Sequence, residues 1–171
     1  EALEAVKPGE APATYVQRVT GLKLEASVQR LKRRELPLAP VLCADTTVAL
    51  GRRILGKPTD AADAQRMLAS LAGQRHRVLT AVAVARPAAR GAGRSWAALS
   101  RSQVAFDNWS AADIRRYVAS GEPMGKAGAY AIQGAAALHI HHISGSYSGI
   151  MGLPAHETAQ LLRAAGVKLV C

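Results

Sequence analysis

Residues 77–86 read Arg-Val-Leu-Thr-Ala-Val-Ala-Val-Ala-Arg, an apolar run that Pro87 ends. The run is rich in β-branched valine and shows no helical period, so it predicts a strand, the strongest in the chain. A second run, Pro40–Leu50, is almost wholly apolar apart from Asp45 and two threonines, and it predicts a strand buried on both faces. A buried carboxylate needs partners or a function. Asp45 is therefore either a hydrogen-bonded aspartate of a turn or part of a site.

Helices are expected on both sides of these two runs. A first helix is predicted by an apolar stripe at helical spacing and is closed by Pro37; the stripe consists of Tyr15, Val19, Leu22 and Ala26. Three more helices are expected from signals at their first turns. These are an N-cap at Thr59, a capping box made by Ser110 and Asp113, and a proline at Pro154.

Shorter strands complete the expected fold. They are predicted at residues 54–55, 101–106, 130–132, 138–143 and 167–170, and residues 88–98 are expected to form a loop. Because strands and helices mix without strict alternation, the sequence predicts an α/β fold with a mixed β-sheet flanked by helices.

Composition limits the choices further. At 171 residues the chain is expected to form a single domain, 1–171, whose core is mostly alanine, valine, leucine and isoleucine because only 4% of the residues are aromatic. The longest apolar runs are too short to span a bilayer. Cys43 and Cys171 do not make a disulfide framework, so a reducing cytosol is the expected compartment.

The chain is strongly basic, with 22 lysines and arginines against 12 aspartates and glutamates and a net charge of +10. That excess favours polyanionic partners, namely nucleic acids, nucleotides or phosphorylated substrates. The densest basic patch lies at the end of the first helix and consists of Arg30, Lys32, Arg33 and Arg34. It is either a solvated helix end, where cations complement the macrodipole, or a binding surface.

A glycine-rich stretch, Gly121–Gly134, carries the most varied polar chemistry. It reads Gly-Glu-Pro-Met-Gly-Lys-Ala-Gly-Ala-Tyr-Ala-Ile-Gln-Gly and holds a carboxylate, an ammonium and an amide at Glu122, Lys126 and Gln133. Glycines let the backbone turn and approach a ligand closely. The stretch is either a surface turn with an ion pair or a binding loop.

Two further clusters favour the binding loop: Asp45-Thr46 at the end of a strand, and Gly56-Lys57-Pro58 before a helix. Lysines and a helix N-terminus suit phosphate oxygens, and carboxylates can hold a divalent cation or activate water. An amide suits the edge of a base. Together these groups indicate hydrolysis within a nucleoside triphosphate, with water attacking phosphorus and pyrophosphate leaving. The sequence contains no P-loop motif.

Several other residues have simpler interpretations. Lys23 lies beside the apolar stripe of the first helix and is expected to be a surface lysine whose stem packs on that stripe. His139, His141 and His142 include a pair that could bind metal, but a surface strand is the preferred interpretation. Trp96 and Trp109 lie near basic residues and could stack on bases, which is weak evidence by itself.

Ordered strings along almost the whole chain carry a resemblance to a known family. They include Ala44-Asp45-Thr46, Gly56-Lys57-Pro58-Thr59-Asp60, Ser120-Gly121-Glu122-Pro123, the run from Lys126 to Gly134, and Gly152-Leu153-Pro154. On these strings the chain resembles the Maf family of nucleoside triphosphate pyrophosphatases, historically called septum-formation inhibitors. The forms Gly-Lys-Pro and Lys-Ala-Gly-x-Tyr-x-Ile-Gln-Gly look like the branch that acts on dTTP and UTP.

The resemblance implies a Maf/ITPase-like, two-lobed architecture with a central cleft. It also implies a cytoplasmic nucleotide diphosphatase that cleans nucleotide pools and uses a divalent cation, Mg²⁺ or Mn²⁺. Asp45 matches the family's general base, and Thr46 and Gln133 match positions that tune substrate choice. The positions that match polar residues of the cleft are Lys57, Glu122 and Lys126. Asp45 or Glu122 is then the candidate metal ligand. The expected partner is a nucleoside triphosphate, without nucleic acid or membrane, and a homodimer is left open.

One departure from the family pattern concerns its beginning. Family members start with a strand followed by Ser-x-Ser-Pro-Arg-Arg, a string that this sequence does not contain. We therefore expect the family's first strand and helix, with their cationic phosphate ligands, to be lacking from this chain. A non-catalytic alternative stays open on the +10 charge: a basic nucleic-acid- or partner-binding protein linked to cell division.

Overall fold

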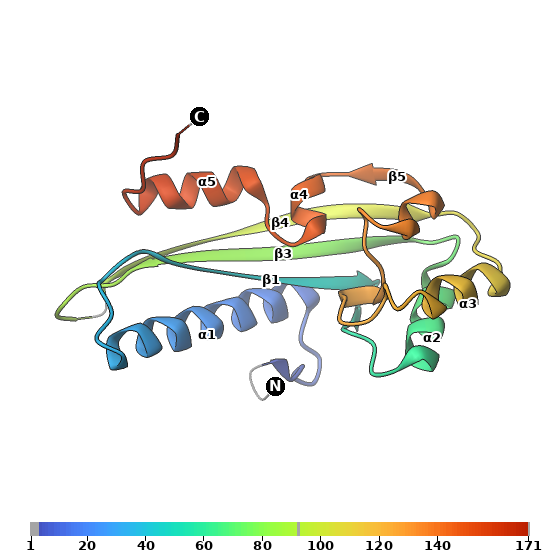
Figure 1. Ribbon diagram of the computed structural model, residues 1–171, viewed down its shortest axis with the longest axis horizontal. Coiled ribbons are helices and arrows are strands. Elements are labelled where there is room, and N and C mark those ends of the chain that lie inside the picture. Colours follow the sequence, from blue (N-terminus) through green and yellow to red (C-terminus); the bar gives the residue numbers. More distant parts are fainter. Residues whose placement is uncertain (1–3, 92, 171) are drawn as a thin grey trace.

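The computed structural model describes residues 4–91 and 93–170 and shows a five-stranded sheet with helices on both faces (Figure 1). In their order across the sheet, the strands are β2 (Arg53–Leu55), β1 (Val41–Leu50), β3 (Arg75–Arg86), β4 (Arg94–Phe106) and β5 (Ile140–Ser144). The expected α/β sheet flanked by helices is confirmed. Each pairing between these strands is antiparallel, in place of the expected mixture of directions.

β3 is the middle strand, as its sequence predicts. It pairs with β1 on one side and β4 on the other, and its residues 78–85 are all buried. α1 (Pro12–Arg33) covers one face of the sheet, and α4 (Tyr147–Met151) and α5 (Ala155–Ala164) cover the other (Figure 1). Valine and alanine fill this strand because small and β-branched side chains pack well between two layers of helices.

β1 is less buried than its apolar sequence suggests. Only residues 47–49 are fully buried, and the remainder of the strand is half-exposed or exposed. β2 pairs with β1 only from Val48 to Leu50, so the outer edge of residues 41–47 has no strand partner within the described part of the chain. This open edge places Asp45 and Thr46 at the surface of a cleft instead of inside the core.

α1 forms because a proline at its first turn and an apolar stripe act together. Tyr15, Val16 and Val19 are buried against Leu79 and Ala81 of β3. Its last turn carries the basic residues Arg30, Lys32 and Arg33, and the helix ends before Pro37 as predicted. None of the helices in the described ranges combines the length and apolar character needed to cross a bilayer.

A second and larger core fills the other end of the sheet. It is formed by α2 (Ala61–Leu71), α3 (Ala111–Ala119) and two 3₁₀ turns, η2 (Ala127–Ala129) and η3 (Ala135–His139), packed on β3 and β4. His76 lies inside this core, and burial lowers its pKa to about 4. Trp109 is also buried there against Phe106 and His139, so it packs the core and does not stack on a base.

Three sequence expectations at element ends are wrong. Asp60, not Thr59, caps α2, because its carboxylate accepts the Asp63 N–H at 2.7 Å. β4 starts at Arg94, so the expected loop at 88–98 is shorter than predicted. Residues 167–170 form no strand.

The strand expected at residues 130–132 is absent as well, for a clear physical reason. The preceding Gly128 and Ala129 have φ values of +70° and +61°, which turn the chain away from an extended path. Tyr130 is instead held by a side-chain hydrogen bond, since its hydroxyl lies 2.8 Å from Nε2 of His76, and it anchors this part of the loop to the core. The apolar residues here are therefore buried by turns and not by sheet pairing.

Candidate active site

A cavity of about 280 Å³ opens where the edge of β1 meets the glycine-rich stretch and the end of α4. Five of the six residues that the sequence nominates line it: Asp45, Thr46, Lys57, Lys126 and Gln133. A second hollow of about 320 Å³ adjoins it, shares Asp45, Thr46 and Lys57, and adds Glu4 and Tyr15 to the walls. The two hollows form a polar cleft along the open edge of β1.

Asp45 is tied to α1 by an ion pair that sequence reasoning missed. Nζ of Lys23 lies 2.5 Å from Oδ1 of Asp45 and 2.6 Å from Oε1 of Glu4. Burial would lower the pKa of Lys23, but its hydrogen bonds to Asp45 and Glu4 outweigh that effect and raise it. The interpretation of Lys23 as a surface lysine is therefore wrong. Its position beside the apolar stripe was the only signal in the sequence, and that position fits either environment.

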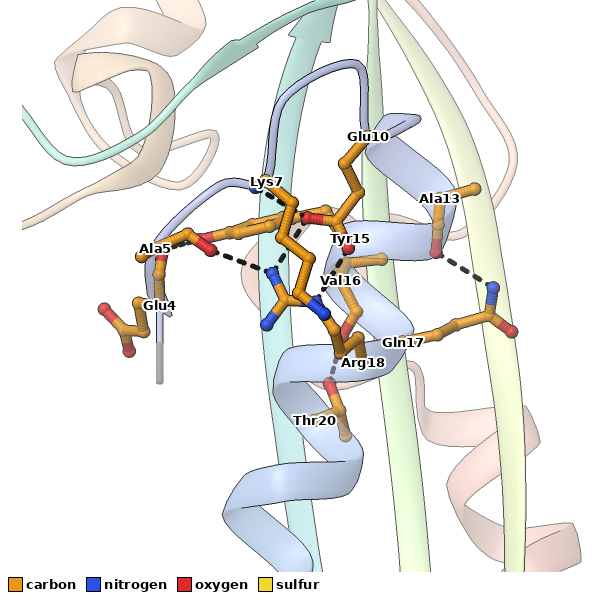
Figure 2. A network of polar contacts seen from close by, with 10 residues as sticks. All are labelled: Glu4, Ala5, Lys7, Glu10, Ala13, Tyr15, Val16, Gln17, Arg18 and Thr20. Carbon is orange, nitrogen blue, oxygen red and sulfur yellow. Dashed lines mark hydrogen bonds and ion pairs between the residues drawn. The ribbon is translucent and has the colours of Figure 1, made fainter. Parts of the chain in front are cut away.

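The segment that carries Glu4 is fixed to α1 by a polar network (Figure 2). Arg18 of α1 binds the Glu10 carboxylate at 2.7 and 2.8 Å and donates to the Ala5 carbonyl at 2.9 Å. The Tyr15 hydroxyl donates to the Glu4 carbonyl at 3.0 Å. The Arg18 guanidinium lowers the pKa of Glu10 to about 2. These contacts hold Glu4 where its carboxylate can reach Lys23, whose hydrogen bond lowers the pKa of Glu4.

Thr46 faces the opposite side of the sheet from Asp45, because successive side chains of a strand alternate. Its hydroxyl oxygen lies 2.8 Å from that of Thr80 on β3, and the Thr80 hydroxyl donates to the Gly149 carbonyl of α4 at 2.7 Å. Asp45 and Thr46 thus bring two faces of the sheet to one cleft.

Lys57 and Lys126 come from two segments that a backbone hydrogen bond joins. The N–H of Gly128 donates to the Gly56 carbonyl at 3.0 Å. Lys126 Nζ donates to the Glu122 carbonyl at 2.7 Å, which directs this lysine along the loop. Lys57 is exposed, and no ion pair holds it among the described residues. The cleft therefore carries one lysine held by a hydrogen bond, Lys126, and one exposed lysine without an ion pair to a described residue, Lys57.

Glu122 is the nominated residue that does not line the cavity. Its carboxylate accepts hydrogen bonds from the Tyr117 hydroxyl at 2.8 Å and the Ala135 N–H at 3.1 Å. Burial and the Glu122 carboxylate both raise the pKa of Tyr117. A Cβ on Gly134 would lie 1.9 Å from Glu122 Oε1, so the loop closes tightly over this carboxylate. Glu122 braces the glycine-rich stretch from behind.

No group of three histidine, cysteine or acidic side chains within residues 4–91 and 93–170 could hold a metal ion. The histidines of β5 do not form such a group either, since His141 Nδ1 instead pairs with Asp107 Oδ1 at 2.9 Å. Among the described residues, a cation in the cleft would find fewer than three ligands of these types.

The polar cleft of this α/β fold presents two carboxylates that both pair with one lysine, two further lysines and an amide. These are the features of a phosphate-handling enzyme. Comparison with known sequences agrees: residues 1–165 match the family described as Maf-like protein, and the chain belongs to this Maf family. It is 64% identical over 169 residues to the dTTP/UTP pyrophosphatase of Albidiferax ferrireducens, covering 99% of this chain and 82% of that protein.

Two more relatives have the same description. The dTTP/UTP pyrophosphatase of Polaromonas sp. is 64% identical over 169 residues, which are 99% of this chain and 81% of the relative. That of Cupriavidus metallidurans is 62% identical over 167 residues, which are 98% of this chain and 81% of the relative.

Proposed function

We propose that this protein is a nucleoside triphosphate pyrophosphatase that hydrolyses dTTP and UTP to the monophosphate and pyrophosphate. The observation that carries the proposal is the Asp45 carboxylate, oriented by Lys23, in a cleft whose other walls present Lys57, Lys126 and Gln133. Identities of 58–64% to relatives described as dTTP/UTP pyrophosphatases support the choice of nucleotides.

Asp45 is the general base of the proposed reaction. Lys23 binds Oδ1, and among the contacts of the described residues Oδ2 has no partner, so Oδ2 is free to accept a proton from water. The water oxygen then forms a bond to the α-phosphorus, and the bond from this phosphorus to the bridging oxygen breaks. Pyrophosphate leaves with the bridging oxygen, and the proton stays on Asp45 until solvent removes it.

Phosphate charge would be met by the lysines of the cleft. Lys57 lies in both hollows and Lys126 in the first, so an extended triphosphate can reach both ammonium groups. Charge-assisted hydrogen bonds to phosphate are stronger than neutral ones. Thr46 and Gln133, in the first hollow with buried Tyr130 and Ile132, would contact the base.

A divalent cation, Mg²⁺ or Mn²⁺, fits this donor set in a limited way. Mg²⁺ is commonly held by one or two carboxylates plus the phosphates of its substrate, and Asp45 with Glu4 beside it offers such a pair only through Oδ2 and Oε2, because Lys23 binds Oδ1 and Oε1. Glu122 is the weaker candidate because its carboxylate is already engaged by Tyr117 and Ala135. A cation held in this way would neutralise charge on the phosphates.

The wider setting belongs to the same proposal. Residues 1–171 would act as one domain, in the cytoplasm, removing unwanted nucleotides from the pool. A homodimer is compatible with this role but is not required by it.

The test is release of pyrophosphate from dTTP and UTP with added Mg²⁺ or Mn²⁺, comparing the wild type with Asp45→Asn and Asp107→Asn. Asp107 is an exposed carboxylate at the end of β4 and controls for the loss of one negative charge. Asp45→Asn should lower kcat by at least about a thousandfold, while Asp107→Asn keeps the wild-type rate. Equal rates for the wild type and Asp45→Asn would contradict the proposed role.

A further inference from the structure

The Thr80 hydroxyl is buried directly beneath the cleft, and the proposed chemistry does not use it. It lies on β3 opposite Thr46 in the register of the sheet, and only 1% of its surface is exposed. Thr46 and Thr80 are separated by 2.8 Å between their hydroxyl oxygens. A buried polar contact of this kind is costly unless each group is satisfied, so the direction of its protons has consequences.

The Gly149 carbonyl fixes the direction of both hydrogen bonds. Thr80 donates its single hydroxyl proton to the Gly149 carbonyl at 2.7 Å, and a carbonyl can only accept. Thr80 therefore has no proton left for Thr46 and must accept from it. The Thr46 proton points inward to Thr80, and only lone pairs of its oxygen remain for other partners.

Those lone pairs border the cleft. Thr46 lines the first hollow together with Gln133 and Gly152. Gly152 has φ +122° and no side chain, and a Cβ there would be 3.7 Å from the Thr46 hydroxyl oxygen. The space next to that oxygen is thus left open by a glycine at the C-terminal end of α4, the helix that Thr80 binds.

We propose that Thr80 is a positioning residue that makes the Thr46 hydroxyl a fixed acceptor, and that this acceptor selects the imide N3–H of uracil and thymine. Cytosine carries a lone pair at N3 and would meet another lone pair. This inference rests on the proposed function and names the feature by which the cleft distinguishes uracil and thymine from cytosine. A sugar hydroxyl is the other group of a nucleotide that could donate to Thr46.

The experiment compares kcat/KM for UTP, CTP, dUTP and 3-methyl-UTP in the wild type, Thr80→Val, Thr80→Ser and Thr20→Val. Thr80→Val removes the hydrogen bond from Thr46 with little change in shape, and Thr80→Ser keeps it. Thr20 of α1 is buried, donates its hydroxyl proton to the Val16 carbonyl at 2.7 Å and lines neither hollow, so Thr20→Val controls for the loss of a buried threonine hydroxyl. Binding of non-hydrolysable α,β-imido-UTP and α,β-imido-CTP, measured by calorimetry, gives a readout that does not depend on turnover.

The wild type should prefer UTP over both CTP and 3-methyl-UTP. In Thr80→Val the Thr46 hydroxyl can turn and donate, so the UTP-to-CTP ratio should fall by about tenfold, while Thr80→Ser and Thr20→Val keep the wild-type ratio. An unchanged ratio in Thr80→Val would overturn the inference. A change confined to the UTP-to-dUTP ratio would overturn it too, because the donor would then be the 2′-hydroxyl.

The two levels of the argument fail in different ways. A wild-type protein that hydrolyses none of the four nucleotides contradicts the proposed function. A wild-type protein that hydrolyses UTP, together with a Thr80→Val variant of unchanged selectivity, contradicts only the role of Thr80. Preferential binding of the imido-UTP analogue that Thr80→Val loses supports the role of Thr80 even where turnover is slow.

Discussion

The two walls of the cleft are built on different physical principles. The strand wall carries Asp45 and Thr46 on β1, held by the register with β3, by the ion pair of Asp45 with α1 and, through Thr80, by a hydrogen bond to α4. The loop wall carries Lys126 and Gln133 on the stretch 121–134, which has almost no regular structure. Its shape comes from backbone turns and from a buried brace behind it, the Glu122 carboxylate with Tyr117 and Ala135.

This difference predicts whether a substitution in each wall lowers activity or stability first. The strand wall is supported mainly by the β1–β3 register and by the apolar packing of α1, so the loss of a polar side chain there should affect chemistry more than folding. The polar groups behind the loop wall are themselves the scaffold, because a buried hydrogen-bonded group costs free energy once its partner is lost. Changes there should appear first as a loss of stability.

The largest effect is expected on the strand wall, from Lys23→Met. The methionine keeps the apolar stem on α1 but removes the cation that orients Asp45 and separates it from Glu4. We expect kcat to fall by about a thousandfold with little change in KM, because the contacts of the loop wall with the nucleotide remain. Steady-state pyrophosphate release measures both constants.

Lys168→Met serves as the matched control, since Lys168 is exposed and far along the chain from the cleft. Its kinetic constants should equal those of the wild type. Near-normal kcat in Lys23→Met would show that the ion pair is only structural, and the contrast between the two walls would then be lost.

The strand wall was the easier of the two to predict from sequence. An aspartate in an apolar run is conspicuous, and Asp45 does lie at the cleft. Lys23 could not be found in this way, because a lysine beside a helical stripe looks the same whether it meets solvent or a carboxylate 22 residues away. Only the packing of α1 against β1 decides between them.

The loop wall was predicted less well, because its path depends on φ angles. Gly121, Gly125 and Gly128 all adopt positive φ, and each turns the chain in a way that neighbouring sequence does not fix. Those turns place Gln133 in the cavity but direct the Glu122 carboxylate behind it. They also replace the expected strand at 130–132 by isolated anchors such as Tyr130.

A second prediction tests whether acid loosens the loop wall first. The pKa of His76 is lowered by burial from 6.5 to about 4, and its Nε2 lies 2.8 Å from the hydroxyl of the loop anchor Tyr130. Between these two pH values the unfolded chain takes up a proton that the folded chain does not. The free energy of unfolding should therefore fall by about 1.4 kcal/mol per pH unit as the pH drops from 6.5, roughly 3 kcal/mol in all.

Urea unfolding at several pH values between 7 and 4 measures this slope. His76→Gln removes the titrating group, so its slope should be shallower than that of the wild type by the amount given, with a lower stability at pH 7. Gln103→Ala, at an exposed position of β4, removes no titrating group and should keep the wild-type slope. Identical slopes in His76→Gln and the wild type would mean that the acid sensitivity lies elsewhere.

The smallest of the three effects is expected from Gly134→Ala, which adds one methyl group to the loop wall. Gly134 has a negative φ, so the strain comes from space and not from backbone conformation: the new Cβ would be 1.9 Å from Glu122 Oε1. The carboxylate must move and give up its hydrogen bonds to Tyr117 and Ala135, a loss of about 2 kcal/mol in the free energy of unfolding.

Gly21→Ala is the matched change beneath the strand wall. It meets no atom within 4 Å and should stabilise α1 by up to about 1 kcal/mol. If urea unfolding shows that Gly134→Ala lowers the free energy of unfolding and Gly21→Ala raises it, the support of the loop wall lies behind the loop, at the Glu122 carboxylate. Equal stability of Gly134→Ala and the wild type would show that the Glu122 carboxylate does not support this wall.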